Sequence, residues 1–592
     1  MGERRRAGRS GGRSAGWGDS AGNWNGRWTG AWAGGSWGRR FGRRGRRLRA
    51  TARDTFGWEQ LRPGQQEAME HLLAGRDVLL VMPTGGGKSA VYQVPALILD
   101  GPTVVVSPLI ALQRDQVMGL LRAGAGGAVA VNSAGSVDAG LDQVTAGHAE
   151  YVFLSPEQLA KPEVVDRLAE TRPSLVAVDE AHCVSAWGHD FRPEYLRLGK
   201  VIERLGRPPV IAMTATAAPT VREEIIRSLG ITGAQQIVRG FDRPNLDLEV
   251  RRFVRDEDKR RALADHAAGL GGVGLVYVAT RRQAEEYAEL LRERGRRAEP
   301  YHAGMKASER REVHERFQGD ELDVVVATSA FGMGIDKPDV RFVLHASPPE
   351  SVDAYYQEIG RAGRDGDPAS AVLFYRSEDL GLRKFFTGGR AGGELLERIA
   401  TIVREHGNGR GGESGGGEGG RNGDEVAAGE LRELLGIGAA KLTSQINLLE
   451  RAGAVEAAHG GGLRYADDGP PPREAAARAV ELDKMRHRLE ESRLDMMRGY
   501  AETTGCRRRF LLEYFGEPYE RACGACDTCR SGEASAPDAG DGPFPLHATV
   551  RHAEWGQGVV MSRESDRVTV LFDSVGYKTL ALQAIDGVLE LA

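Results

Sequence analysis

The feature that most constrains the fold is a series of short, β-rich apolar runs separated by helical stretches. Between residues 51 and 240 these runs are Val78–Met82, Thr103–Val106, Tyr151–Leu154, Leu175–Val178 and Val210–Met213. Runs that are apolar throughout are typical of parallel strands covered by helices on both faces. The alternation restarts with Gly274–Val278, Val324–Ala327, Val340–Leu344 and Ala371–Tyr375. The sequence therefore predicts an α/β protein with two tandem doubly wound parallel-sheet domains, residues 51–240 and 241–387.

Residues 1–50 differ from the rest of the chain in composition. They carry 13 Arg against two acids, Glu3 and Asp19, and they hold five of the eight Trp. No helix or strand period is visible, so we expect this Gly/Arg/Trp-rich tail to be disordered. The whole chain has a net charge of −4, so without the tail's +11 the remainder is near −15. Overall charge therefore neither favours nor opposes a nucleic-acid partner.

Four smaller units are predicted after the second domain. Residues 388–475 contain a Gly-rich tract, two short helical segments and a hairpin pattern, which indicates a winged-helix-like insertion. Residues 476–531 are expected to form a helical four-cysteine subdomain, and residues 532–545 a linker. Residues 546–592 contain four or five short strands, which favours a small SH3- or Tudor-like β-barrel.

We expect a cytoplasmic protein, in the bacterial cytoplasm or nucleoid, with no membrane partner. No run of 18 or more apolar residues occurs. The start, MGERRRAGRS, lacks the apolar segment of a secretory signal. The sequence does not indicate an oligomeric state.

The loop after the first strand has the composition of a phosphate-binding loop. Glycines let backbone N–H groups approach phosphates, Lys88 would neutralise the β and γ oxygens, and the Ser89 hydroxyl would ligate magnesium. The strict G-x-x-x-x-G-K-S pattern is met only from Gly87 onward, and a Gly-rich turn beside a lysine is the plain alternative. The residues predicted to bind ATP here are Thr84, Gly85, Gly86, Gly87, Lys88 and Ser89.

The tetrad Asp-Glu-Ala-His follows the predicted strand Leu175–Val178. Asp179 is expected to hold magnesium through water, and Glu180 to orient and activate the attacking water. His182 is interpreted as coupling hydrolysis to movement, although a structural histidine remains the alternative.

The second domain supplies the segment QEIGRAGRDG, residues 357–366. Hydrolysis builds charge on the γ-phosphate, and an inserted arginine stabilises that charge. We predict that Arg364 is this arginine, that Arg361 also contacts the γ-phosphate, and that Gln357 belongs to the nucleotide site. A surface charge cluster is the alternative.

Four of the five cysteines are spaced C-x16-C-x2-C-x2-C. They are Cys506, Cys523, Cys526 and Cys529. Without a secretory signal, such spacing favours metal binding over disulfides. Four thiolates suit a closed tetrahedral zinc site. Unrelated buried or redox cysteines are the alternative.

From about Phe56 to Tyr375 the chain resembles the RecQ family of superfamily 2 DNA helicases. The segments that carry the resemblance include FGWEQLRPGQQEAM, VMPTGGGKSAVYQVPAL, VDEAHCVSAWGHDFRPEY and VVATSAFGMGIDKPDVRFV. The four cysteines resemble the family's zinc subdomain. The resemblance implies two RecA-like domains and ATP-driven 3′-to-5′ unwinding, with single-stranded and forked duplex DNA as partners, in repair and recombination.

Several residue roles are implied by the resemblance. The expected adenine-recognition residues are Trp58 for stacking, Arg62 for positioning and Gln65 for a hydrogen bond to the base edge. The expected sensors of single-stranded DNA are Trp187, Phe191 and Arg192. The expected coupling residues beyond His182 are Thr214 and Thr216. The expected contacts to the DNA backbone are Ser107, Asn132 and Thr328.

Two features depart from the family pattern. The winged-helix-like stretch precedes the cysteines, whereas in the family a winged helix usually follows them. The C-terminal segment resembles the Tudor-like module of UvrD/PcrA-type helicases, which implies a protein partner such as RNA polymerase; a barrel that binds DNA or packs on the chain itself is the alternative. Two other functions stay open, an RNA helicase and a DNA- or RNA-polymerase-binding adaptor with a vestigial motor.

Overall fold

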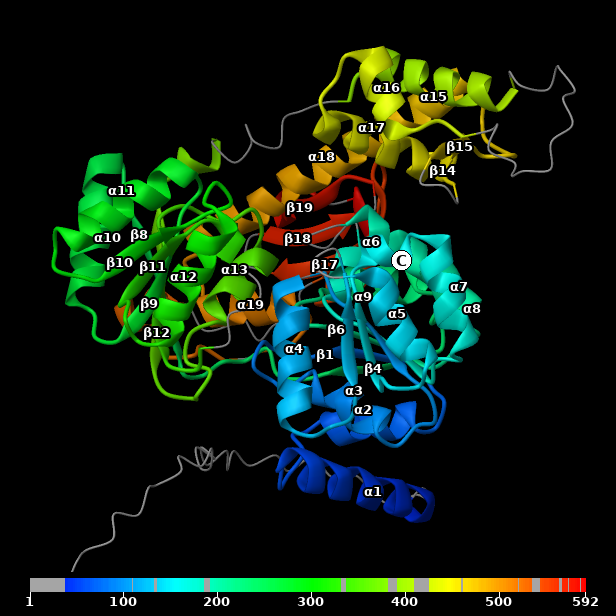
Figure 1. Ribbon diagram of the computed structural model, residues 1–592. Coiled ribbons are helices and arrows are strands. Elements are labelled where there is room, and N and C mark those ends of the chain that lie inside the picture. The colour runs from blue at the N-terminus through cyan, green and yellow to red at the C-terminus, as the bar shows by residue number, and fades with distance from the viewer. Residues whose placement is uncertain are drawn as a thin grey trace, which may run out of the picture.

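The structure is a computed structural model. It describes residues 38–592 apart from 109, 133–135, 186–191, 332–336, 382–390, 409–424, 459–461, 520, 535–542, 564–566, 573 and 586. Two α/β lobes lie side by side, a long helix crosses them, and two small units sit at the ends of that helix (Figure 1). No helix in the described part of the chain is both long and apolar enough to cross a membrane.

The first lobe is built on a seven-stranded parallel sheet in the order β3-β4-β2-β5-β6-β1-β7. Its strands are β1 (Val78–Val81), β2 (Thr103–Val106), β3 (Ala128–Val131), β4 (Tyr151–Leu154), β5 (Leu175–Val178), β6 (Val210–Thr214) and β7 (Gln235–Val238). The inner strands are buried along their whole length because helices cover both faces. This confirms the predicted parallel-sheet architecture.

The helices of the first lobe are α2 (Gln65–Leu72), α3 (Ala90–Ala96), α4 (Ile110–Arg122), α5 (Val137–Thr145), α6 (Pro156–Leu159), α7 (Pro162–Glu170), α8 (Leu198–Arg204) and α9 (Pro219–Ser228). Two short 3-10 turns, η1 (Ala181–Val184) and η2 (Pro193–Arg197), follow β5. In a parallel sheet, the loops after the strands share one edge. The segments after β1, β5 and β6 therefore meet at one end of the sheet.

The second lobe is a six-stranded parallel sheet in the order β10-β11-β9-β12-β13-β8. Its strands are β8 (Leu246–Arg252), β9 (Val273–Tyr277), β10 (Ala298–Tyr301), β11 (Val324–Ala327), β12 (Val340–His345) and β13 (Ala369–Tyr375). Its helices are α10 (Asp256–Gly269), α11 (Arg281–Arg292), α12 (Ala307–Gln318) and α13 (Val352–Ile359), with the 3-10 turn η3 (Ser329–Phe331). The second doubly wound domain is thus also confirmed.

The N-terminal tail requires a correction. Residues 1–37 lie outside the described residues, but helix α1 (Gly38–Phe56) occupies the end of the segment that we expected to be disordered up to residue 50. The helix forms because Leu48 and Ala52, one turn apart, are fully buried against the first lobe. Two anchors in an otherwise polar segment give no visible period, which explains the error.

The insertion between the second lobe and the cysteines has the predicted order of helices and hairpin. It contains α15 (Gly393–Asn408), α16 (Ala428–Leu435), α17 (Ala439–Arg451) and the antiparallel pair β14 (Val455–Ala457) and β15 (Leu463–Tyr465). Most of its Gly-rich tract lies outside the described residues. The insertion has its own apolar core and docks on the first lobe, where Arg197 forms an ion pair with Glu450 of α17.

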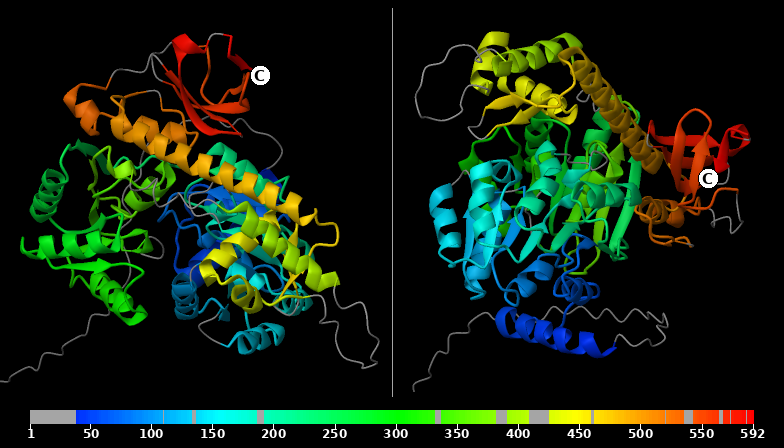
Figure 2. Two further views of the ribbon diagram at one scale, coloured as in Figure 1. Left: turned by 90° about the horizontal axis from the view of Figure 1, so that it is seen from above. Right: turned by 90° about the vertical axis from the view of Figure 1, so that its right-hand side faces the viewer.

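Helix α18 (Pro472–Glu502) runs from the insertion along both lobes to the segment that carries the cysteines (Figure 2). It is followed by α19 (Arg507–Tyr514) and α20 (Asp527–Ser531), which carry the cysteine segment.

The last unit, here called the C-terminal sheet, is antiparallel in the order β19-β18-β17-β16-β20. Its elements are β16 (Thr549–His552), β17 (Gly556–Arg563), β18 (Arg567–Phe572), β19 (Gly576–Ala581), the 3-10 turn η4 (Leu582–Ala584) and β20 (Leu589–Leu591). The sheet has a small apolar core of its own and packs on α18 and α19.

Candidate nucleotide and zinc sites

The loop after β1 needs its three glycines. Gly85 and Gly87 have φ angles of +77° and +80°, where residues with a side chain are strained. A Cβ atom at Gly86 would lie 2.6 Å from Met82 Cγ and 2.8 Å from the Pro83 carbonyl oxygen. The loop can therefore keep this compact path, which suits close approach of an anion to its backbone, only with glycine at these positions.

Two residues expected at the adenine base contact this loop. Gln65 Nε2 donates hydrogen bonds to the carbonyl oxygens of Gly87 (2.9 Å) and Gly86 (3.3 Å), and an Arg62 guanidinium nitrogen donates to that of Gly85. Trp58 stacks on Phe56, with ring centroids 4.5 Å apart and planes 12° apart. Gln65 and Arg62 thus lie at the predicted site, and the roles of all three residues toward the base stay predictions.

Lys88 lies directly after the glycines. Its Nζ donates a hydrogen bond to the Met82 carbonyl oxygen at 3.2 Å. Burial lowers the pKa of the Lys88 ammonium and nearby Arg364 lowers it further, while Glu180 and Asp179 oppose this. A polyanion at this loop would favour the charged ammonium and compensate for its burial.

The carboxylates of Asp179 and Glu180 stand at the end of β5. Burial, and then repulsion from Glu180, raise the pKa of Asp179 to about 7, and Lys88 opposes the shift. Glu180 has a left-handed backbone (φ 48°), and its N–H donates to Asp179 Oδ1 at 3.0 Å. Two oxygen ligands held close with little solvent suit a hard divalent cation, which would remove their mutual repulsion. Asp179 therefore fits as a ligand of Mg²⁺, with the Ser89 hydroxyl as the other predicted ligand and Glu180 beside it for the attacking water.

His182 joins the Glu180 carboxylate to the segment after β6. Its Nδ1 lies 3.3 Å from Glu180 Oε2 and 2.9 Å from Thr214 Oγ1. The Thr214 hydroxyl donates to the Thr216 carbonyl oxygen at 2.9 Å and accepts from the Thr216 N–H at 3.2 Å. His182, Thr214 and Thr216 are all buried. The three residues expected to couple hydrolysis to movement thus form one contiguous network.

The expected DNA-backbone contacts of the first lobe are also linked. Gln113 Nε2 donates to the Ser107 carbonyl oxygen at 2.8 Å, and Asn132 Nδ2 donates to Gln113 Oε1 at 2.9 Å. Gln113 was not predicted, because one glutamine in an amphipathic helix is unremarkable. Arg192 donates to the Pro108 carbonyl oxygen at 3.4 Å, beside the same segment.

Three further expected DNA contacts remain. Thr328 lies at the end of β11 in the second lobe, where its N–H donates to the Tyr301 carbonyl oxygen at 3.2 Å. Trp187 and Phe191, the aromatic residues of the proposed sensing loop, lie outside the described residues.

The second lobe brings an arginine to the phosphate-binding loop. Helix α13 carries Gln357 and leads into Arg361, and both are buried. A Cβ atom at Gly85 would lie 3.4 Å from Arg364 Cγ and 3.5 Å from its Cδ. The Arg364 side chain therefore packs directly on the loop of the other lobe, as expected for an arginine that reaches a phosphate across a cleft.

The four cysteines come together in space. The sulfur atoms of Cys506, Cys523, Cys526 and Cys529 all lie within 4.8 Å of one another. Cys523 Sγ and Cys529 Sγ are 3.8 Å apart, and the Cys526 N–H donates to Cys523 Sγ at 3.3 Å. Two thiolates at tetrahedral positions on zinc, each about 2.3 Å from the metal, would be about 3.8 Å apart. The cluster therefore fits zinc.

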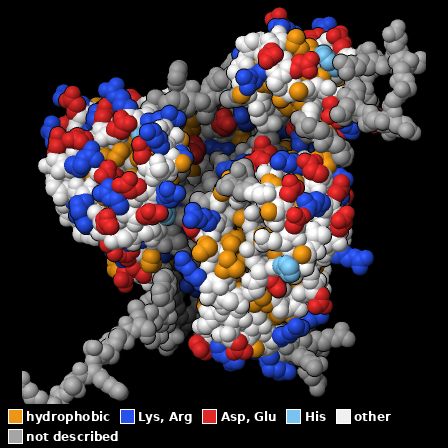
Figure 3. Space-filling view, viewed as in Figure 1, with side chains coloured by type: hydrophobic (Ala, Val, Ile, Leu, Met, Phe, Trp, Pro, Cys, Tyr) orange, Lys and Arg blue, Asp and Glu red, His pale blue; other side chains and the backbone are white. Residues whose placement is uncertain are grey.

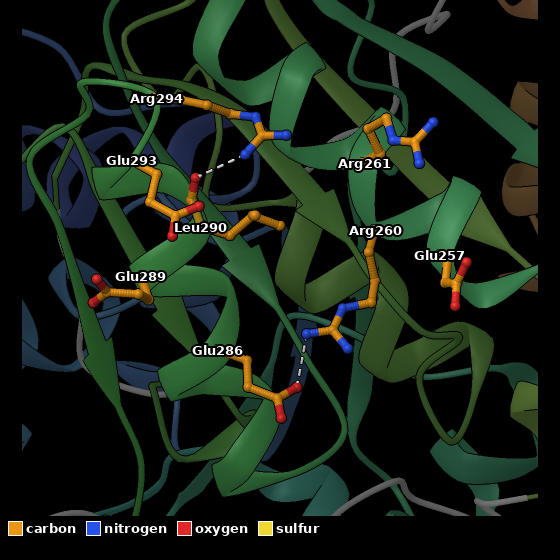
Figure 4. Close-up of a pocket in the computed structure, with 8 residues that line it drawn as sticks. All are labelled: Glu257, Arg260, Arg261, Glu286, Glu289, Leu290, Glu293 and Arg294. Carbon is orange, nitrogen blue, oxygen red and sulfur yellow. Dashed lines mark hydrogen bonds and ion pairs between the residues drawn. The ribbon is translucent and has the colours of Figure 1, made fainter.

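A shallow charged hollow lies elsewhere on the second lobe, between α10 and α11 (Figure 4). Arg260 pairs there with Glu286 at 2.8 Å, and Arg294 donates to the Leu290 carbonyl oxygen at 3.1 Å. None of the predicted site residues lines this hollow. Because it is open and holds no predicted site residue, we assign it no role.

Three family descriptions match this chain. They are DEAD/DEAH box helicase over residues 62–225, helicase conserved C-terminal domain over residues 258–366, and RecQ zinc-binding over residues 473–530. The first contains the phosphate-binding loop and the Asp-Glu pair, the second ends at Gly366 beyond Arg364, and the third contains all four cysteines. The cofactors that follow are ATP with Mg²⁺ in the cleft and Zn²⁺ at the cysteines.

Proteins similar in sequence are also named as DNA helicases. A probable ATP-dependent DNA helicase RecS of Bacillus subtilis is 33% identical over 494 residues, which cover 82% of this chain and 91% of the relative. ATP-dependent DNA helicases RecQ of Bacillus subtilis and Haemophilus influenzae are 43% and 42% identical, but the match spans only 56% of either relative and 56% and 60% of this chain. Among solved structures, Mycobacterium smegmatis helicase Lhr aligns with a TM-score of 0.47 at 21% identity, covering 73% of this chain and 62% of that one. On its sequence relatives and its zinc segment, the chain belongs to the RecQ family of superfamily 2 helicases.

Proposed function

We propose that this protein is an ATP-dependent 3′-to-5′ DNA helicase that couples ATP hydrolysis to translocation on single-stranded DNA and to duplex unwinding. The observation that carries the proposal is the contact of Arg364, from the second lobe, with Gly85 in the phosphate-binding loop of the first lobe. Because the hydrolytic residues are divided between two lobes, each cycle of binding and hydrolysis can close and open the cleft. Repeated closure on a bound strand produces stepwise movement.

Each residue of the cleft has a task in this proposal. The loop amides and Lys88 bind the β- and γ-phosphates, and Ser89 and Asp179 hold magnesium, which neutralises charge on the phosphates when bound. Glu180 orients and activates the attacking water. Arg364 stabilises the charge that builds on the γ-phosphate, and Arg361 and Gln357 support it from the end of α13.

The chain's own contacts provide a route from hydrolysis to DNA. His182 touches both the Glu180 carboxylate and Thr214. The expected DNA-sensing loop, Ser185–Tyr195, begins directly after η1 and contains Arg192. We propose that Trp187, Phe191 and Arg192 bind single-stranded DNA by stacking and by charge, and that Ser107, Asn132 and Thr328 line its phosphate path. Trp58, Arg62 and Gln65 would recognise adenine after releasing their present contacts.

The units outside the two lobes are given only general roles. We propose the division of the chain given in the sequence analysis, with α1 added to the first lobe. DNA is the partner of the motor, in repair and recombination in the cytoplasm. A protein partner such as RNA polymerase is proposed for the C-terminal sheet, where Val588 and Leu591 are exposed apolar residues on or beside its edge strand β20. Loss of polymerase capture after Val588→Glu and Leu591→Glu, with helicase activity retained, would support that docking.

An RNA helicase is the second candidate, since Asp-Glu-Ala-His motors include RNA enzymes. The match to the RecQ zinc segment favours DNA. The deciding experiment compares ATPase stimulation by single-stranded DNA and by RNA of the same length and sequence. Stronger stimulation by DNA supports the proposal, and stronger stimulation by RNA overturns it. A vestigial motor is tested by the same assay, because it would hydrolyse ATP with neither.

A further inference from the structure

Helix α1 is a docked, strongly basic helix on the outside of the first lobe (Figure 1). Its sequence contains eight arginines, at 39, 40, 43, 44, 46, 47, 49 and 53, and one acid, Asp54. A helix of 19 residues is about 28 Å long. On the face of the two lobes shown in Figure 3, by contrast, basic and acidic side chains are interspersed.

The charges of α1 are largely uncompensated in the described part of the chain. Arg53 pairs with Asp54, and Arg49 donates to the side-chain oxygen of Gln66 at 2.8 Å. Arg44 and Arg46 are exposed and make no hydrogen bond or ion pair with any described residue, and exposed Arg47 makes one long contact, 3.5 Å, to the Ile98 carbonyl oxygen. Like charges spaced three or four residues apart destabilise a helix. A bound polyanion would remove that repulsion.

The other face of α1 is already occupied. Leu48 and Ala52 are fully buried in the apolar core of the first lobe, and a Cβ atom at Gly45 would lie 2.7 Å from Glu70 Oε1. The helix is therefore fixed on the motor, and its residues from 44 onward, whose side chains are described, leave no free apolar face to insert into a bilayer. A membrane-binding amphipathic helix needs such a face. The outward arginines thus suit the phosphate backbone of a nucleic acid better than a lipid surface.

We propose that α1 is a second DNA-binding surface of the motor, which holds the phosphate backbone of duplex DNA outside the cleft between the lobes. The inference rests on the proposed function for its choice of DNA. Duplex DNA is favoured because it carries a dense, regular array of phosphates, about one charge per 1.7 Å of helix axis, and the docked helix concentrates its arginines within about 28 Å. Guanidinium groups bind phosphate oxygens through paired donors.

The test uses the full chain with Arg44, Arg46 and Arg47 all changed to alanine. The three side chains are exposed and alanine favours helix, so the fold is retained. The affinity for a blunt duplex falls as salt rises. Loss of three phosphate contacts should make this dependence less steep, reducing the magnitude of the slope of log affinity against log salt by about 2.7. The defect of the variant should therefore shrink by about 40-fold between about 50 and 200 mM salt. The matched control changes Arg261, Arg282 and Arg311, three exposed arginines of the second lobe, to alanine.

Measuring duplex binding and ATPase activity separately distinguishes this inference from the helicase proposal. ATPase activity at saturating single-stranded DNA should be the same in the variant, the control and the unaltered chain. A salt slope for the duplex that is equal in the variant and the control overturns the inference, whatever the ATPase does. A change seen only with single-stranded DNA, or only with anionic lipid vesicles, overturns it as well. Absence of DNA-stimulated ATPase in the unaltered chain would instead count against the motor.

Discussion

A buried chain of hydroxyl and carboxylate groups connects the C-terminal sheet to the motor. The Tyr577 hydroxyl of β19 donates to that of Tyr514 at 3.2 Å, and the Tyr514 hydroxyl donates to the Asp353 carboxylate at the start of α13. Tyr514 and Asp353 are each only 3% exposed. Since α13 leads to Arg361, this chain ties the last unit to the helix that positions the predicted phosphate contacts.

The substitution Tyr514→Phe removes one hydroxyl and keeps the ring. It leaves the buried Asp353 carboxylate without its donor, and an unsatisfied buried group costs about 1–3 kcal/mol, more when charged. We therefore expect a loss of about 2–3 kcal/mol in unfolding free energy. For a cooperative unit of 150–250 residues, each kcal/mol lowers Tm by about 2–4 °C, which gives about 4–12 °C.

Differential scanning calorimetry of the full chain measures this change. The control is Tyr301→Phe, because Tyr301 is a partly buried tyrosine whose hydroxyl makes no hydrogen bond among the described residues. Tyr577→Phe should have a smaller effect than Tyr514→Phe, since it spares the bond to Asp353. If Tyr514→Phe and Tyr301→Phe have the same Tm, the hydrogen bonds from Tyr577 through Tyr514 to Asp353 contribute nothing to stability and the reasoning is wrong.

Three further predictions follow from the nucleotide and zinc sites. Lys88→Ala should reduce ATPase at least 100-fold while DNA binding, measured by fluorescence anisotropy, stays within a fewfold; unchanged ATPase would refute the site. Metal analysis should find about one zinc per chain, and Cys526→Ser should lose it and lower Tm, whereas Cys183→Ser should keep it. Because burial raises the folded pKa of Asp179 to about 7, the group destabilises the nucleotide- and magnesium-free fold increasingly as pH rises from about 4 to 7. Asp179→Asn should therefore raise Tm by a few degrees at pH 8, by about a third as much at pH 5 and hardly at pH 4; a gain independent of pH would contradict the assignment.

The sequence predicted the two sheets because their central strands are buried on both sides and so are apolar throughout. It missed strands at or beside the edges. Gln235–Val238 is half-exposed, and Leu246–Arg252 alternates between buried and partly exposed residues. The phosphate-binding loop and the four cysteines were predictable because their chemistry fixes both residue type and spacing.

Contacts between distant units were not predictable. Nothing in the sequence links Tyr514, Tyr577 and Asp353, and only the tertiary fold buries them together. The same holds for Gln65, whose amide contacts the phosphate-binding loop rather than solvent. Helix α1 escaped prediction because its two buried anchors are too few to set a period.

Strand displacement tests the central claim most directly. The unaltered protein, with ATP and Mg²⁺, is given matched duplexes that carry a 3′ tail, a 5′ tail or a fork, and release of the labelled strand is followed over time. The account predicts unwinding of the 3′-tailed and forked duplexes, little unwinding of the 5′-tailed one, and none without ATP or with Lys88→Ala. Equal unwinding of both tailed duplexes, unwinding without ATP, or no unwinding of any of them would contradict it.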